Sequence, residues 1–169
     1  MQNDLKPYQI IERMVELRKG CSDADILTEL EALPPLSDED DPCWDTEKYW
    51  VEVAYPYIAL GDLIAERKLR EAVPMLLDRA CFGDPGEIMR GLRNGLEAAV
   101  EGDWNYLADI CISAARSERL GTRLWAIDEL AVLDDPRSRS IFEDAIRTGP
   151  AEIRSLAQIG LERLGDDAA

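Results

Sequence analysis

The chain has 169 residues, and its 46% hydrophobic content is enough for a buried core, which excludes an intrinsically disordered protein. Its formal net charge of −16 repels phosphate backbones and argues against nucleic-acid binding, while it favours either a basic protein partner or simple solubility. Apolar residues are scattered at short intervals, so we expect no insertion into a membrane.

The N-terminal part predicts a helical pair followed by an acidic connector. Apolar residues recur at helical spacing through the first twenty residues. Ser22 or Asp23 can cap a second short helix, which ends before Pro34. We therefore expect residues 1–36 to form a helical cap and residues 37–45 to form the connector.

From residue 46 onward, Gly, Asp and Pro recur at regular intervals and separate predicted helices. Each Asp can cap the next helix, and each Pro is tolerated in a first turn but not deeper. The expected helices are 46–61, 69–81, 86–100, 104–117, 121–133, one ending near 148, and 150–164. Taken in pairs, they give repeats at 46–82, 84–118 and 120–148 with a final half-repeat at 150–165.

One segment occurs nearly twice, sixty-five residues apart. PGEIMRGLRNGLEAAVEGD begins at Pro85, and PAEIRSLAQIGLERLGDDA begins at Pro150. Because one helical pair cannot bury its apolar face alone, such a repeat predicts a stack of pairs that share a core. The chain is therefore expected to be all-α, with its helical pairs arranged as a solenoid.

Two stretches resemble the consensus of HEAT-like repeats. They are ALGDL…REAVPMLLDRA, from Ala59 to Ala80, and LWAIDELAVLDDPRSRSIFEDAI, from Leu124 to Ile146. The resemblance covers roughly residues 46–166 and implies a right-handed α-solenoid of helical hairpins preceded by the N-terminal cap. It indicates a fold more than a function, because such repeats bind many unrelated partners.

A narrower resemblance lies in the segments LGTRLWAIDEL and GLRNGLEA. Short acidic proteins with such segments are similar to the HEAT-like family of cyanobacterial bilin lyases and to relatives that help dismantle phycobilisomes. Members attach, detach or chaperone linear tetrapyrroles on phycobiliproteins. The resemblance implies a phycobiliprotein subunit as partner and a linear tetrapyrrole as the only cofactor-like ligand. No catalytic residue is assigned, because a chain without histidine lacks the usual acid–base group of enzymes.

Aromatic residues form the first set of candidate binding residues. If several share one face, they make a stacking wall for a flat conjugated ligand. The alternative is a role in the core, which is the common one for aromatic residues at helical spacing. The candidates are Trp44, Trp50, Tyr57, Trp104 and Trp125.

Arginine residues form the second set. Arg90 and Arg93 lie three residues apart with Asn94 beside them, and Arg123 has a comparable position in the next repeat. Guanidinium groups suit carboxylates, such as the two propionates of a bilin, because they bind them through two hydrogen bonds. The alternative is pairing with the many Asp and Glu side chains of the chain itself.

The cysteines and the connector predict little chemistry. The four cysteines are widely spaced, so we expect reduced thiols and no metal site. The connector lacks the spacing of a calcium loop, and we expect a solvated mobile loop, with attraction of a basic partner or a divalent cation as the alternatives. The first twenty residues include acidic side chains, unlike a secretory signal, so a cytoplasmic protein is expected.

Three functions remain open at this stage. The first is recognition of a protein partner on the concave face, specifically the handling of phycobiliproteins or their chromophores. The second is an acidic module, such as an inhibitor or immunity-type binder, that neutralises a basic partner and binds it less well at high salt. The third is a scaffold for peptides in which the aromatic side chains are buried.

Overall fold

The chain is described by a computed structural model over residues 5–166, except for the side chains of Glu87 and Asp166. Every regular element within this range is helical, and no strand occurs there, which confirms the predicted all-α class. Contacts divide the chain into two compact units, of which the first ends at Glu101 and the second begins at Gly102. The predicted division into repeats is not tested by this boundary and stays a prediction.

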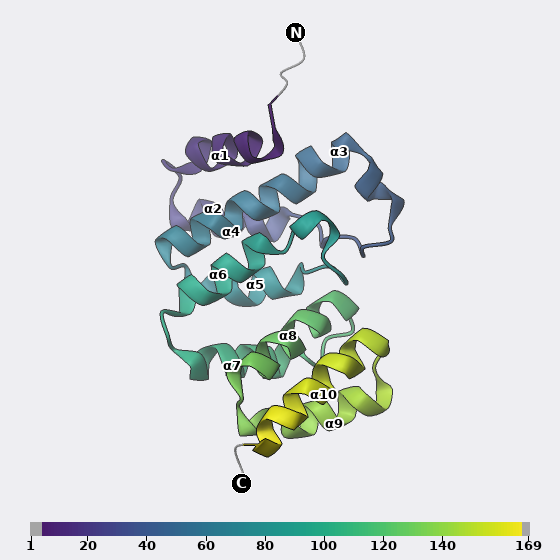
Figure 1. The fold of residues 1–169 in the computed structure, drawn as a ribbon. Helices are drawn as coiled ribbons and strands as arrows, with labels where there is room; N and C mark the ends of the chain where they lie inside the picture. The colour runs from purple at the N-terminus through teal and green to yellow at the C-terminus, as the bar shows by residue number, and fades with distance from the viewer. Residues whose placement is uncertain (1–4, 167–169) are drawn as a thin grey trace. The chain divides into compact units, whose positions relative to one another are not determined.

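The first unit is built around one long central helix (Figure 1). Its helices are α1 (Pro7–Arg18), α2 (Asp23–Ala32), α3 (Glu47–Tyr49), α4 (Tyr55–Arg67), α5 (Val73–Asp78) and α6 (Arg90–Val100). A π-helical turn, Trp50–Ala54, joins α3 to α4 without interrupting the helical backbone. Helix α4 contacts both α1 and α6, while α2 and α5 pack behind them.

Helix α4 continues past Gly61 to Arg67, so the predicted helix end at Gly61 was wrong. The glycine serves a long-range contact instead. A Cβ atom at Gly61 would lie 2.3 Å from the carbonyl oxygen of Gly91, and one at Gly91 would lie 2.8 Å from the Cα atom of Ile58. Helices α4 and α6 therefore meet backbone to backbone, at a distance that only glycine permits.

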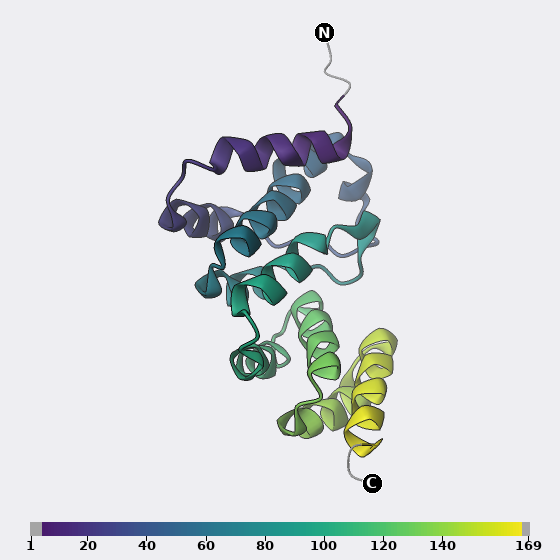
Figure 2. The same ribbon diagram turned by 60° about the vertical axis from the view of Figure 1, so that its left-hand side comes forward.

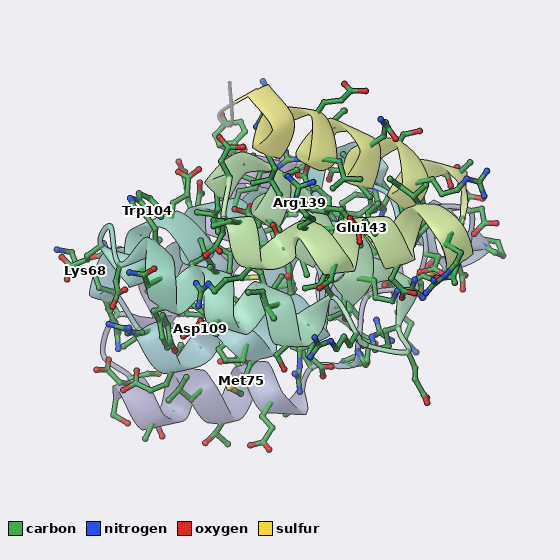
Figure 3. The ribbon with its side chains drawn as sticks, turned by 90° about the horizontal axis from the view of Figure 1, so that it is seen from below. Lys68, Met75, Trp104, Asp109, Arg139 and Glu143 are labelled. Atoms are coloured by element: carbon green, nitrogen blue, oxygen red, sulfur yellow. The ribbon has the colours of Figure 1, made fainter. Side chains whose placement is uncertain are left out.

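The second unit contains four main helices (Figure 2). They are α7 (Trp104–Ala114), α8 (Leu120–Leu133), α9 (Arg139–Thr148) and α10 (Ala151–Asp166). Helix α10 packs against both α8 and α9, and α7 packs against α8. Arg139, labelled in Figure 3, donates a hydrogen bond from Nη2 to the carbonyl oxygen of Leu164 (3.3 Å) and so joins α9 to α10.

The repeated sequence segment has the same packing role in both units. A Cβ atom at Gly95 of α6 would lie 2.5 Å from Cδ1 of Leu76, and one at Gly160 of α10 would lie 2.5 Å from the ring of Phe142. Each glycine leaves space for a large apolar side chain of the preceding helix. The similarity of the two segments is therefore explained by packing.

Short 3₁₀ helices account for most other differences between predicted and observed helix bounds. They precede α3, α5, α6 and α9, at Pro42–Asp45, Arg70–Ala72, Pro85–Glu87 and Pro136–Ser138. Three of the four begin with proline, and an aspartate caps two of these three. Both features favour a tight turn before the α-helix begins. The predicted cap of α2 is confirmed, since Ser22 Oγ accepts a hydrogen bond from the amide of Asp25 (3.2 Å).

The acidic connector makes hydrogen bonds to the segment that follows α5, while its expected mobility is not tested and stays a prediction. Just before the connector, the amide of Leu36 donates to the carbonyl of Arg79, and within it the amide of Glu39 donates to the carbonyl of Phe82, each at 2.9 Å. The amide of Phe82 donates in return to Oδ1 of Asp38 (3.1 Å). Through these hydrogen bonds, the connector packs along the segment that follows α5.

No helix within residues 5–166 is both long and apolar enough to cross a membrane. The expected cytoplasmic location is not tested and stays a prediction.

Thr122, in the first turn of α8, gives a prediction about stability. Its side chain is 3% exposed, and its hydroxyl has no hydrogen-bond partner among the described residues. Removing an unsatisfied buried hydroxyl while keeping the shape stabilises a fold, so Thr122→Val should raise the free energy of unfolding by about 1 kcal/mol. Urea denaturation measures this change. Thr122→Ser is the control, and it should be no more stable than the original because it keeps the hydroxyl and loses the methyl group.

Candidate functional site

A groove crosses one face of the first unit, between α1 and α6, with α4 as its floor. It consists of two adjoining cavities of about 460 and 550 Å³, which share Tyr8, Ile11 and Arg90. We call the first the aromatic end and the second the acidic end of the groove. Of the candidates predicted from the sequence, Trp50, Arg90 and Asn94 line it.

The aromatic end is formed by Tyr8, Trp50 and Tyr55 over Ile58. The rings of Trp50 and Tyr55 have centroids 5.5 Å apart and are tilted by 43°. In an α-helix, residues five apart point about 140° away from each other, as follows from 3.6 residues per turn. The π turn places them on the same side, because its hydrogen bond joins residues five apart: the amide of Tyr55 donates to the carbonyl of Trp50.

Pro56 explains why the helix widens here. Proline has no amide hydrogen, and its ring clashes with the carbonyl group four residues earlier in a regular α-helix. A π turn directly before it relieves this conflict while the helix continues into α4. The sequence analysis missed the resulting pair of rings, although a proline inside an apolar helical pattern was the signal that could have revealed it.

The side chain of Trp50 is held in place by Trp44, which lies outside the groove. Its Nε1 donates to the carbonyl of Trp44 (2.8 Å), and the two indole rings meet edge to face at 5.3 Å. Trp44 Nε1 donates in turn to the carbonyl of Asp38 in the connector (2.9 Å). The predicted candidate Trp44 thus fixes the orientation of Trp50 and does not line the groove.

At the acidic end, Arg90 and Asn94 bind the same carboxylate. Arg90 Nη2 lies 3.3 Å from Asp62 Oδ2, and Asn94 Nδ2 donates to Asp62 Oδ1 (2.9 Å). Glu12 and Glu16 of α1 face them across the groove, and Glu16 pairs with Lys19 (2.7 Å). Three carboxylates and two cationic groups therefore line this end, and the carboxylate of Glu12 has no partner among the described residues.

The remaining predicted candidates lie elsewhere. Arg93 pairs with Asp84 (Nη2–Oδ2 3.4 Å) outside the groove, as the alternative of internal pairing supposed. Tyr57 is fully buried and donates its hydroxyl hydrogen to the carbonyl of Leu76 (3.0 Å), and burial raises the pKa of this phenol. Tyr57 is therefore a core residue.

Three predicted candidates belong to the second unit. Trp125 is buried, with 5% of its side chain exposed. Trp104, at the start of α7, is 53% exposed (Figure 3). Arg123 is half-buried and lines a cavity between α8 and α9. The structure thus brings together three of the nine predicted residues, and sequence reasoning missed Tyr8, Tyr55 and the carboxylates that complete the groove.

Three of the four cysteine side chains have a raised pKa. Burial raises the pKa of Cys81 to about 12 and also raises the pKa of Cys111. Burial likewise raises the pKa of Cys43, so these three thiols stay protonated near neutral pH. No cluster of three or more Cys, Asp or Glu side chains within residues 5–166 has the arrangement of a metal site.

No protein family, curated protein or solved structure matches this chain. The resemblance to HEAT-like repeats and to bilin lyases thus rests on the quoted segments alone.

Proposed function

We propose that this protein is a recognition module that binds a basic segment of a partner protein in the groove between α1 and α6. The proposal is carried by one observation: the aromatic end of the groove adjoins the acidic end, in a chain with a net charge of −16. It corresponds to the second of the functions left open by the sequence, an acidic binder of a basic partner.

The two ends of the groove suit different parts of such a segment. Exposed aromatic side chains such as Tyr8, 51% exposed, are the residues that most often supply binding energy at protein interfaces. Glu12 is exposed and makes no ion pair with any residue that the structure describes, so it can bind a Lys or Arg side chain of the partner without first breaking such a pair. The acidic field of the whole chain increases the association rate with a basic surface.

We further propose that the helical pairs form a HEAT-like right-handed solenoid, as the resemblance implies. Within the first unit, α1, α4 and α6 would be the first helices of three successive pairs, and they pack in that order. The groove lies on the face that these first helices share. Such faces are the usual binding surfaces of repeat proteins.

A second candidate ligand is a linear tetrapyrrole, in keeping with the bilin-lyase resemblance and a phycobiliprotein partner. The neighbouring rings of Trp50 and Tyr55 favour it, because they offer a stacking surface next to the guanidinium of Arg90. Asp62, Glu12 and Glu16 disfavour it, because they repel the propionates that Arg90 would bind.

The test is a calorimetric titration of the full chain with a basic amphipathic helical peptide of Lys, Leu and Phe. We expect saturable binding that weakens with salt and falls about tenfold in both Tyr8→Ser and Glu12→Lys, a loss of about 1.4 kcal/mol each. Both side chains are exposed, so neither change should unfold the protein. Glu97→Lys is the matched control, because it makes the same charge change on an exposed side chain of α6 outside the groove.

Two results would contradict this proposal. If Glu97→Lys and Glu12→Lys lost the same affinity for the peptide, binding would depend only on the net charge of the protein. Absence of peptide binding, together with saturable binding of biliverdin that weakens in Arg90→Ala and not in Arg93→Ala, would favour the tetrapyrrole, since Arg93 lies outside the groove.

A further inference from the structure

A second cavity lies within the C-terminal unit and has a different character. It measures about 510 Å³ and is formed by the end of α7, the first turn of α8 and one face of α9. Three of its side chains are arginines: Arg116, Arg123 and Arg147. Among the groups that line it, Asp144 has the only carboxylate.

This concentration of positive charge contrasts with the rest of the unit. From Gly102 to the end of the sequence there are 13 acidic and 8 basic residues, and all 8 are arginines. Three of these arginines line one cavity, where they outnumber the single aspartate. Clustered arginine side chains produce a local positive potential, and such a potential stabilises a bound anion.

Two of the three guanidinium groups have no partner within residues 5–166. Arg147 pairs with Asp144 (2.5 Å), whereas the side chains of Arg116 and Arg123 make no hydrogen bond or ion pair among the described residues. Arg123 also lies in the first turn of α8, where the helix dipole disfavours a cation. This half-buried arginine, which the sequence analysis had selected, therefore has an unfavourable position that a bound anion would offset.

We propose that this cavity binds a small organic molecule through a phosphate or carboxylate group held by Arg116 and Arg123. Guanidinium groups bind either oxyanion through paired hydrogen bonds, and the hydroxyl of Ser140 on α9 can donate a further one. The cavity volume falls in the range of about 300–1,000 Å³ that is typical of small-molecule sites, so it suits an organic anion better than a bare ion. The site is independent of the groove between α1 and α6.

The test uses the full chain and three probes: inorganic phosphate, glycerol 3-phosphate and succinate. We expect saturable binding by calorimetry, tightest for glycerol 3-phosphate if phosphate is recognised and for succinate if carboxylates are. Arg116→Ala and Arg123→Ala should each weaken binding at least tenfold. Arg123→Lys should also weaken it several-fold, because lysine keeps the charge and loses the paired hydrogen bonds.

Arg13→Ala is the matched control, since it removes the same charge from an exposed position on α1 and should leave binding unchanged. Thermal unfolding without ligand provides a second readout. Because neither guanidinium has a partner to lose in the described part of the chain, Arg116→Ala and Arg123→Ala should keep or raise the midpoint of unfolding while binding falls. The proposal is overturned if none of the three probes binds at millimolar concentration, or if Arg13→Ala weakens binding as much as the cavity variants do.

Discussion

Gly61→Ala is expected to lower the free energy of unfolding by about 3 kcal/mol, at the upper end of the usual effect of overpacking. The added Cβ atom would lie 2.3 Å from the carbonyl oxygen of Gly91. Both helices present backbone at this point, so no side-chain rotation can relieve the clash. The helices must move apart, and the cavity that this opens weakens the surrounding apolar contacts. Urea denaturation followed by circular dichroism measures the loss.

The matched control is Gly165→Ala in α10, where no atom lies within 4 Å of the added Cβ. There the same substitution acts only through helix propensity, which favours alanine by up to about 1 kcal/mol. The two variants should therefore change stability in opposite directions. If Gly61→Ala were as stable as Gly165→Ala, α4 and α6 could not be in backbone contact.

Features set by neighbouring residues were predictable from the sequence. The all-α class and the capping of α2 by Ser22 depend on helical spacing and on contacts within one turn. The repeated segment that contains Gly95 and Gly160 was also visible in the sequence. The residues that meet them, Leu76 and Phe142, are identified only by the structure.

Features set by distant contacts were not predictable. Gly61 resembles a helix end, but its role depends on Gly91 in another helix. Arg90 and Arg93 look equivalent in sequence, yet only Arg90 lines the groove, because its side chain lies beside α4 and Tyr8 of α1, whereas Arg93 pairs with Asp84. The aromatic end of the groove also needs the π turn at Trp50, which hydrophobic periodicity does not reveal and for which Pro56 was the only local signal. Local patterns therefore predict helices, whereas the candidate site depends on how they meet.

Arg67, at the end of α4, shows how the groove depends on a contact outside it. Its guanidinium donates to the carbonyl oxygens of Cys21 (2.8 Å), Arg18 (3.1 Å) and Lys19 (3.1 Å), and it binds Asp23 (3.1 Å). The carbonyl group of Arg18 closes the last turn of α1, and those of Lys19 and Cys21 follow it, at the end of a helix that leaves acceptors without intrahelical partners. The carbonyl of Arg18 also accepts from the amide of Cys21 (3.0 Å). One arginine of α4 thus satisfies the end of α1 and anchors it to the central helix.

Arg67→Ala is accordingly expected to lower the free energy of unfolding by about 2 kcal/mol, less than the sum of its bonds because water can reach the freed carbonyl groups. Amide hydrogen exchange should accelerate in α1 before it does in α6, since α1 loses its anchor. Binding of the basic peptide should weaken as well, because Tyr8 and Glu12 are carried by α1. Arg13→Ala, which removes an exposed arginine of α1, should alter none of the three. Unchanged exchange in α1 of Arg67→Ala would mean that its apolar contacts with α4 suffice to hold this wall of the groove in place.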